Sequence, residues 1–371
     1  MKFSCNQQVL SKALNTVSKA VSSRTTINIL KGILLKAAPD NKLCLSASDL
    51  DISIEKTVEA NVEEEGSIVV SAKLFTDIIR KLPNEEITVE VTDNGNVRVK
   101  TLNSEFNIYG QSADEFPNIG EVKEVSAHLS FDRKMLGDMI RKTYFCASID
   151  ESKGIIIGVL FELENGYFDM AALDGFRMAV AREKMETEKD VKIVISARNL
   201  GEINKILSES ENDENIELII SDKKAVVLLE KTKIVVRLLE GEFIKYRDIL
   251  PKAYETDMII DRDALLESIE RAALLAKEGK NKLVKFTIKN DLLDITSTSE
   301  DGAVKEDIIM DKTGGDLEIG FNSNYMMDAL KAIYDEQIKM RFNTAVTPCV
   351  IQPVEGDSYE YLVLPVRIPT M

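Results

Sequence analysis

The stretch IVVSAKLF at residues 68–75 decides the fold, because it returns twice further along the chain. Related segments stand at residues 193–200 (IVISARNL) and 319–326 (IGFNSNYM), so the three copies lie 125 and 126 residues apart. Each copy joins apolar residues typical of a strand to a capping residue and an amphipathic stretch typical of a helix start. Self-similarity at one fixed period predicts three domains of similar fold.

Two further series recur with nearly the same period, one at spacings of 126 and 129 residues and the other at 125 and 126. One consists of FSCN at 3–6, LSFD at 129–132 and MIID at 258–261, and the other of ASD at 47–49, ALD at 172–174 and TSE at 298–300. Chance does not hold three registers at one spacing, and a chain of 371 residues has room for domains of roughly 100–150 residues. Turn-rich stretches at 113–118 and 241–251 then predict domains at residues 1–125, 126–253 and 254–371.

Each repeat carries two helical patterns among strand-like alternation. Helices are predicted in the windows 7–23, 71–82, 132–145, 196–208, 261–277 and 322–334. Their expected N-caps are Asn6, Ser71, Asp132, Ser196, Asp261 or Asp263, and Asn322. The apolar faces are expected to include Val9, Leu10 and Leu14 in the first helix, and Leu74 and Phe75 in the second. Residues 87–91 and 97–101 alternate around a turn at 93–96, which predicts a hairpin and an α+β fold with helices on one face of antiparallel sheet.

The positive charge is concentrated in the predicted helices. The whole chain has 47 Lys and Arg against 63 Asp and Glu, whereas the six windows contain fifteen against nine. If three like domains place their helices on one side, the helices form a basic surface backed by an acidic remainder. Such a surface attracts duplex DNA, whose charges come one per ~1.7 Å. No aromatic or Asn/Gln cluster is suited to reading base edges, so binding is expected to be independent of sequence.

Several function classes find no support in the sequence. It contains no GxxxxGK loop, no GxGxxG after a strand, no HExxH and no metal-spaced Cys/His cluster, so we expect no catalytic activity, cofactor or metal. Cys5, Cys44, Cys146 and Cys349 are predicted to be buried thiols, and His128 to be structural or exposed. No apolar run reaches the ~18–20 residues of a spanning helix, and the start lacks a signal-peptide core, so we expect a cytoplasmic protein.

Two alternatives stay open at this point. An enzyme would need a sharply activated carboxylate in an enclosed pocket, and the carboxylates are too many to single one out. A repeat scaffold that binds only proteins is favoured by the net charge of -16 and opposed by the charge of the helices.

Four segments together resemble one family over the full length of the chain. They are MKF at 1–3 with Val9-Leu10 and Arg24 before an Ile-Leu run, DGFRMAV at 174–180, GEFIKYRDILP at 241–251, and YLVLPVRI at 361–368. The chain resembles the bacterial DNA polymerase sliding clamp, the beta subunit of the replicative DNA polymerase III holoenzyme. The resemblance implies a half-ring of three domains with the DNA clamp fold. It also implies a head-to-tail homodimer that encircles double-stranded DNA and slides along it, without membrane association.

The resemblance also implies three sets of site residues. DNA contacts fall on Arg24, Lys73, Arg198 and, in the loop 149–154, Lys153; this loop departs from the family because it is partly acidic and lacks aromatic residues. The subunit interface falls on Phe106 and Ile108 facing Leu274 and Leu275, although each pair would also suit a core.

The third set is an apolar cleft for short linear motifs of the replicative polymerase, the clamp loader and repair proteins. It is expected to be lined by Leu173, Gly175, Arg177, Met178, Ile244, Ile249, Pro348, Leu362, Val363, Leu364, Pro365, Val366 and Arg367. A terminal core strand is the alternative for LVLPV at 362–366. Phe176 stands where the family often has histidine, and residues 369–371 extend beyond the family's usual end.

Overall fold

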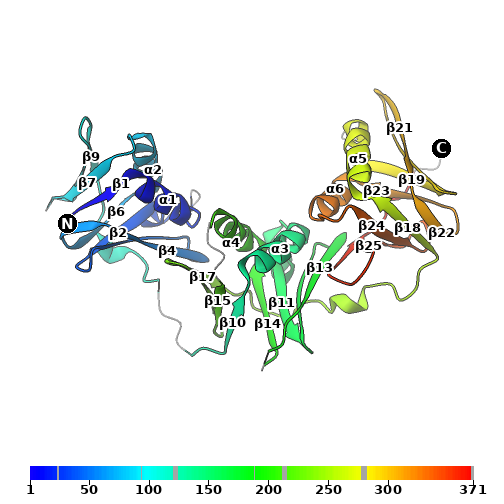
Figure 1. Cartoon of the computed structure of the whole chain (residues 1–371), viewed down its shortest axis with the longest axis horizontal. Coiled ribbons are helices and arrows are strands. Elements are labelled where there is room, and N and C mark those ends of the chain that lie inside the picture. The colour runs from blue at the N-terminus through cyan, green and yellow to red at the C-terminus, as the bar shows by residue number, and fades with distance from the viewer. Residues whose placement is uncertain are drawn as a thin grey trace. The chain divides into compact units, whose positions relative to one another are not determined.

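The structure is a computed structural model that describes residues 1–22, 25–92, 94–119, 124–187, 189–210, 215–276 and 282–368. The chain forms two compact units. Unit 1 contains Met1–Leu136 and Glu202–Leu238, and unit 2 contains Gly137–Gly201 and Leu239–Met371. Each unit is built on two antiparallel sheets with helices packed against them (Figure 1).

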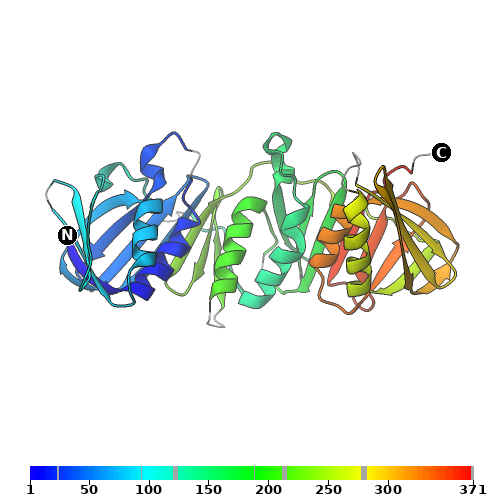
Figure 2. The ribbon, with the colours of Figure 1, turned by 90° about the horizontal axis from the view of Figure 1, so that it is seen from above.

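Unit 1 holds a five-stranded and an eight-stranded sheet. The order of the first is β5 (Asn61–Glu64), β1 (Lys2–Asn6), β7 (Glu86–Val91), β8 (Asn96–Lys100), β9 (Glu105–Tyr109). The order of the second is β10 (Ala127–Phe131), β15 (Ile216–Ile220), β16 (Lys224–Leu229), β17 (Thr232–Arg237), β4 (Ile52–Glu59), β3 (Lys42–Ser48), β2 (Gly32–Ala38), β6 (Gly66–Ser71). Helices α1 (Gln7–Ser18) and α2 (Ala72–Lys81) lie side by side in Figure 2, and α1 packs on β3 and β4.

Unit 2 holds a nine-stranded and a four-stranded sheet. The order of the first is β14 (Val191–Ser196), β11 (Gly158–Glu164), β12 (Tyr167–Leu173), β13 (Arg177–Lys184), β26 (Tyr359–Val363), β25 (Cys349–Pro353), β24 (Gln337–Phe342), β18 (Thr256–Asp261), β22 (Asp311–Gly314). The order of the second is β21 (Gly302–Ile309), β20 (Leu292–Ser299), β19 (Leu283–Lys289), β23 (Leu317–Asn322). Helices α5 (Arg262–Ala276) and α6 (Ser323–Lys331) pack on each other, and α5 also packs on β20 and β21 (Figures 1 and 2).

The remaining elements connect these parts. Helices α3 (Arg133–Thr143) and α4 (Ala197–Glu209) each begin in one unit and end in the other. Short 3-10 turns are η1 (Asn28–Lys31), η2 (Ala113–Glu115), η3 (Tyr144–Cys146), η4 (Glu151–Ile157) and η5 (Tyr246–Asp248). The α+β class with antiparallel sheets is therefore confirmed.

All six predicted helices are present, with small errors in their caps and faces. Asn6 caps α1 by accepting a hydrogen bond from the Gln8 amide at 2.9 Å, whereas Ser71 precedes α2 without a side-chain cap bond. The expectation that Val9 and Leu74 face inward is wrong, since they are 42% and 49% exposed. Successive helical residues are rotated by about 100° around the helix axis. Val9 and Leu74 therefore lie at the margin of the apolar face, whereas the next residues, Leu10 and Phe75, are buried in it.

The predicted hairpin at 87–101 is confirmed as β7 and β8. Gly95 in its turn has φ +72°, a left-handed conformation that glycine adopts without strain. The preceding Asp93, part of the predicted turn, lies outside the described residues.

Two strand pairs join sheets of successive repeats. In unit 1, β4 pairs antiparallel with β17, with Ile54 opposite Ile234. In unit 2, β13 pairs antiparallel with β26, with Ala179 opposite Tyr361. Strands β4, β13 and β21 begin at residues 52, 177 and 302, so they follow the repeat of 125. Within the described residues, the third member, β21, is an edge of the four-stranded sheet, and β9 is an edge of the five-stranded sheet.

The four cysteines are free thiols, and the single histidine lies at the surface. Cys5, Cys146 and Cys349 are buried free thiols and Cys44 is half-buried. His128 is exposed, with its Nε2 2.8 Å from the Glu217 carboxylate. Among the described helices, none has the length and apolarity needed to cross a membrane.

Candidate binding cleft and basic residues

An apolar cluster underlies the segment 241–251, here called the linker. Three predicted cleft residues, Leu173, Met178 and Leu362, are buried in this cluster. From the linker, Phe243, Tyr246 and Leu250 pack onto them, as do Ile155 and Ile156. β13 and β26 bring these residues together because Met178 lies opposite Leu362 in the strand pair. The sheet and the linker therefore share one apolar floor.

Exposed apolar side chains lie next to this floor. Ile244 and Ile249 of the linker are each 43% exposed, and Leu364, directly after β26, is 36% exposed. Pro348, Pro365 and Val366 are half-buried, Val363 is buried and Arg367 is exposed. Exposed Leu and Ile beside a buried apolar floor offer anchoring surface for the apolar side chains of a peptide.

Backbone hydrogen bonds hold the tail after β26 in place. The Leu364 amide donates to the Phe176 carbonyl at 2.9 Å, and the Val366 amide donates to the Gly320 carbonyl at 2.8 Å. A Cβ added at Gly320 would lie 2.7 Å from the Val366 carbonyl oxygen, so the close approach requires glycine. At the other end of the contact, Gly175 in the turn before β13 has φ +94°. The tail is thus held by one hydrogen bond to the turn before β13 and by another to β23.

The Arg177 guanidinium is bound by the chain's own groups. Its Nε donates to Asp174 at 3.0 Å, its Nη1 to Asp328 at 2.6 Å and its Nη2 to the Phe145 carbonyl at 3.0 Å. Burial acts against its charge, yet the neighbouring carboxylates keep the pKa of Arg177 above its ordinary value. Arg177 therefore ties the β12–β13 turn to α6.

Sequence reasoning missed an aromatic pair beside Arg177. The rings of Phe176 and Tyr325 stack with centroids 6.1 Å apart at 22°, and the Arg177 guanidinium lies 4.6 Å from the Tyr325 ring centroid. Phe176 remains 59% exposed. No local signal connects Tyr325 on α6 with a turn about 150 residues earlier, so only the fold reveals the pair.

Buried carboxylates anchor the linker to the sheet. Asp169 on β12 is 1% exposed and accepts hydrogen bonds from Arg182 at 2.7 and 2.8 Å, Arg247 at 2.7 Å and Tyr246 at 2.9 Å. Glu162 on β11 accepts from the same Tyr246 hydroxyl at 3.1 Å and pairs with Arg247 at 2.7 Å. Burial alone would raise the pKa of Asp169, but the bonds from Arg182 and Arg247 hold it below its usual value. Burial, reinforced by both carboxylates, raises the pKa of Tyr246.

The predicted DNA contacts lie on separate elements. Lys73 and Arg198 are exposed and occupy the second position of α2 and α4, again 125 residues apart. Lys153 is exposed in η4, where the next residue, Gly154, has φ +63°. Ile149 of the same loop is fully exposed. Arg24 lies outside the described residues.

The predicted interface residues lie on the edge strand β9 and on helix α5. Phe106 on β9 is 39% exposed and Ile108 is buried, while Leu274 on α5 is 65% exposed and Leu275 is half-buried. Leu274 is on α5, and α5 packs on the edge strand β21.

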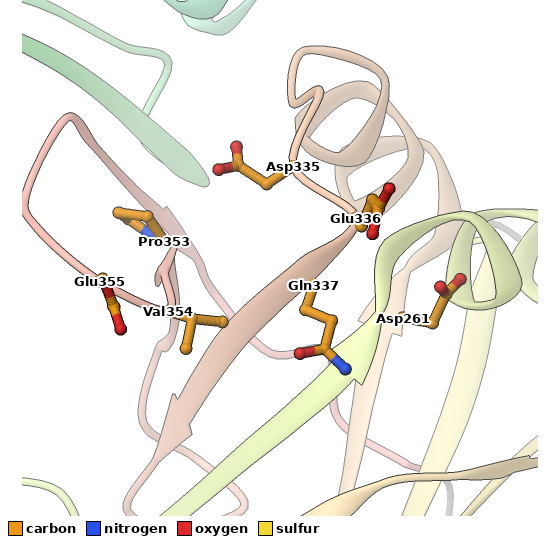
Figure 3. A pocket seen from close by; sticks show the side chains of 7 residues that line it. All are labelled: Asp261, Asp335, Glu336, Gln337, Pro353, Val354 and Glu355. Atoms are coloured by element: carbon orange, nitrogen blue, oxygen red, sulfur yellow. The ribbon is translucent and has the colours of Figure 1, made fainter.

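A cavity of about 530 Å³ in unit 2 is lined by acidic residues (Figure 3). Asp335 and Glu336 precede β24, Asp261 ends β18 and Glu355 follows β25. Among the described residues, no group of three or more His, Cys, Asp or Glu side chains is arranged to hold a metal ion. This cavity is lined by residues from none of the three predicted sets.

Comparisons with known proteins agree along the whole chain. Family models match for the DNA polymerase III beta subunit N-terminal domain at residues 1–120, its central domain at 130–245 and its C-terminal domain at 247–367. A beta sliding clamp of Staphylococcus epidermidis is 34% identical, with 99% of each chain covered. The crystal structure of the DNA polymerase sliding clamp from Bacillus subtilis superposes with a TM-score of 0.94 at 32% identity, covering 100% of both chains. That of a putative DNA polymerase III beta subunit from Eubacterium rectale gives 0.92 at 35% identity, covering 99% of both.

Proposed function

Because the chain belongs to the DNA polymerase III beta subunit family, the beta sliding clamps, we infer that it is a non-catalytic processivity factor of DNA replication. It encircles double-stranded DNA without sequence preference and tethers the polymerase and other partners. The observation that carries this function is the full-length match in sequence and fold, in all three repeats.

Open strand edges support a head-to-tail homodimer. Repeats one and two are joined by β4 and β17, and repeats two and three by β13 and β26. In the third repeat the equivalent of β4 and β13 is β21, and in the first repeat the equivalent of β17 and β26 is β9. Pairing β21 with β9 of a second copy repeats the same joint, and a dimer with two such joints closes into a ring of six domains.

The predicted apolar interface fits this joint. Phe106 and Ile108 lie opposite Val99 and Val97 of β8, which are fully buried, so they face the helix side of their sheet. On the other chain, α5 covers the corresponding side of β21 and exposes Leu274. We place Phe106 and Ile108 against Leu274 and Leu275 at each of the two joints.

DNA contact is proposed for Arg24, Lys73, Lys153 and Arg198. Lys73 and Arg198 stand in the first turns of α2 and α4. The positive end of the helix dipole lowers the stability gained from a cation there, but the dipole and the cation together attract a phosphate group. Exposed cations at equivalent positions of two repeats suit weak contacts along the phosphate backbone, as a sliding ring requires.

The cleft is proposed to bind linear motifs of partner proteins with apolar anchors. Leu173, Met178 and Leu362 form the floor, and Ile244, Ile249 and Leu364 are the accessible apolar contacts. Gly175, Pro348, Val363, Pro365 and Val366 shape the surrounding backbone, while Arg367 is exposed for polar contacts. Arg177 acts by holding the β12–β13 turn, since its donors already bind Asp174, Asp328 and Phe145.

Replacing Leu364 with Ala is expected to weaken motif binding by roughly tenfold, because truncating an anchoring contact costs more than about 1 kcal/mol. Calorimetric titration of the dimer with a peptide carrying Leu and Phe anchors measures the change. Leu292→Ala is the matched control, as Leu292 at the start of β20 is 37% exposed and lies outside the predicted cleft set. Unchanged affinity of the Leu364 variant would place the cleft elsewhere.

Topological binding predicts retention on circles alone. After loading by a clamp loader and ATP, the protein should stay on a nicked circular DNA. When the circle is cut to a linear form, the protein should slide off the ends during an incubation of equal length. Gel filtration of the DNA separates bound from free protein. Equal retention on both forms would point to ordinary contact binding, and no retention on either would favour the protein-only scaffold.

Domain boundaries near residues 125 and 253 are proposed, supported by family matches that meet between 120 and 130 and at 245–247. We also propose a cytoplasmic location, because the family to which the chain belongs acts in DNA replication.

A further inference from the structure

Glu105 on the solvent side of β9 and Lys305 on the solvent side of β21 each form ion pairs within the chain. On β9, Glu105 forms ion pairs with Arg98 at 3.3 Å and Lys100 at 3.6 Å. On β21, Lys305 forms ion pairs with Asp307 at 3.1 Å and Asp294 at 3.6 Å. Glu105 is 47% exposed and Lys305 is 56% exposed. On its solvent side β9 therefore presents the Glu105 carboxylate, and β21 presents the Lys305 ammonium beside Asp307, which is 49% exposed.

The sides of the two strands limit how they pair. Phe106 and Ile108 face the helix side, so Glu105 and Asn107 face solvent. On β21, Val304 and Glu306 lie opposite Ser297 and Ile295 of β20, which are buried, so Lys305 and Asp307 face solvent. Residues paired across two strands must point to the same side of the sheet. The allowed registers between β9 and β21 therefore differ from one another by shifts of two residues.

Charge chooses between the central registers. One places Asp307 opposite Glu105, which sets two carboxylates against each other. The next places Lys305 opposite Glu105 and Val304 opposite Phe106, so that an ion pair and an apolar pair form together. We propose that Glu105 and Lys305 of the second copy set the register of the subunit joint, which rests on the proposed ring. The resulting ladder runs Lys100, Glu105, then Lys305 and Asp294 of the second copy, with alternating sign.

Charge reversal tests this pairing. In Glu105→Lys the joint would set lysine against lysine, and in Lys305→Glu it would set glutamate against glutamate. Each homodimer has two such joints, so the dissociation constant of either variant should rise roughly tenfold or more in low salt. Lys36→Glu, a reversal at an exposed position of β2, should leave it unchanged. Sedimentation of each purified full chain gives the dissociation constants.

Mixing the two variants provides the decisive measurement. A dimer of one Glu105→Lys chain and one Lys305→Glu chain has opposite charges at both joints, so it should recover the wild-type dissociation constant. An affinity tag on one variant identifies the mixed species. Wild-type affinity in the separate variants, or failure of the mixture to recover, would overturn the register. A monomeric wild type would overturn the ring itself, so the two failures are distinguishable.

Discussion

A chain with both Phe106→Ala and Leu274→Ala is expected to sediment as a monomer at concentrations where the unaltered chain is a dimer. In the proposed joint between β9 and β21 each truncation removes a large apolar contact, and a ring closed by two copies would contain that joint twice. At about 1–2 kcal/mol for each of the four truncated side chains, the loss is about 4–8 kcal/mol, or a rise of roughly 10³-fold or more in the dissociation constant.

The control for this change is a pair of apolar side chains outside the joint whose exposures lie between those of Phe106 and Leu274. Leu50 and Val125 are 56% and 55% exposed, and neither lies on β9, β21 or α5. Leu50→Ala with Val125→Ala should preserve the dimer. If the Phe106 and Leu274 variant also stays dimeric, the two subunits meet through another surface.

The second large effect is expected from Asp169→Asn. Asparagine keeps the shape of the side chain but removes the charge that holds Arg182, Arg247 and the Tyr246 hydroxyl. The arginines are partly exposed and water screens them, so we expect a loss of about 2–3 kcal/mol in the free energy of unfolding at pH 7, below the value for a fully buried pair. Urea unfolding followed by circular dichroism, at one protein concentration, measures it.

The effect of Asp169→Asn should also depend on pH in a defined direction. The folded pKa of Asp169 is below the unfolded value of about 3.9, so the carboxylate contributes its stability above that pH. The contribution falls as the pH drops through the folded pKa, and the variant and the unaltered chain should converge in acid. Asp190→Asn, at an exposed position before β14, is the control and should change stability at neither pH. A difference that persists in strong acid would show that shape or packing, rather than charge, is responsible.

Local pattern predicted most of the fold. The six helices and the β7–β8 hairpin depend on residues near one another in sequence, where periodicity and caps act, and the repeat of 125 residues was recognised by comparing such local segments. The errors arose where a neighbouring element decides burial. Val9 and Leu74 have helical spacing that suits the apolar face, yet each lies just outside the buried stripe.

The site was less predictable than the fold. Leu173, Met178 and Leu362 were assigned to the cleft only through the resemblance, and their own patterns fit core strands equally well, as their burial shows. The bond from Arg177 to Asp328 joins residues 151 positions apart, and the network around Asp169 joins β12 to the linker 78 residues later. Such pairs follow from tertiary packing, and no local signal in a single sequence specifies them.

The two joints within each chain have a tether that the joint between chains lacks. The peptide that connects successive repeats keeps β4 near β17 and β13 near β26, so a separated pair meets again at high effective concentration. In the proposed joint between subunits, β9 and β21 belong to different chains, so no peptide connects them directly after they separate. In the proposed ring, a loader that must admit a DNA strand therefore meets the least resistance to lasting separation between subunits, although the joint proposed there repeats the strand pairing of the two joints within the chain.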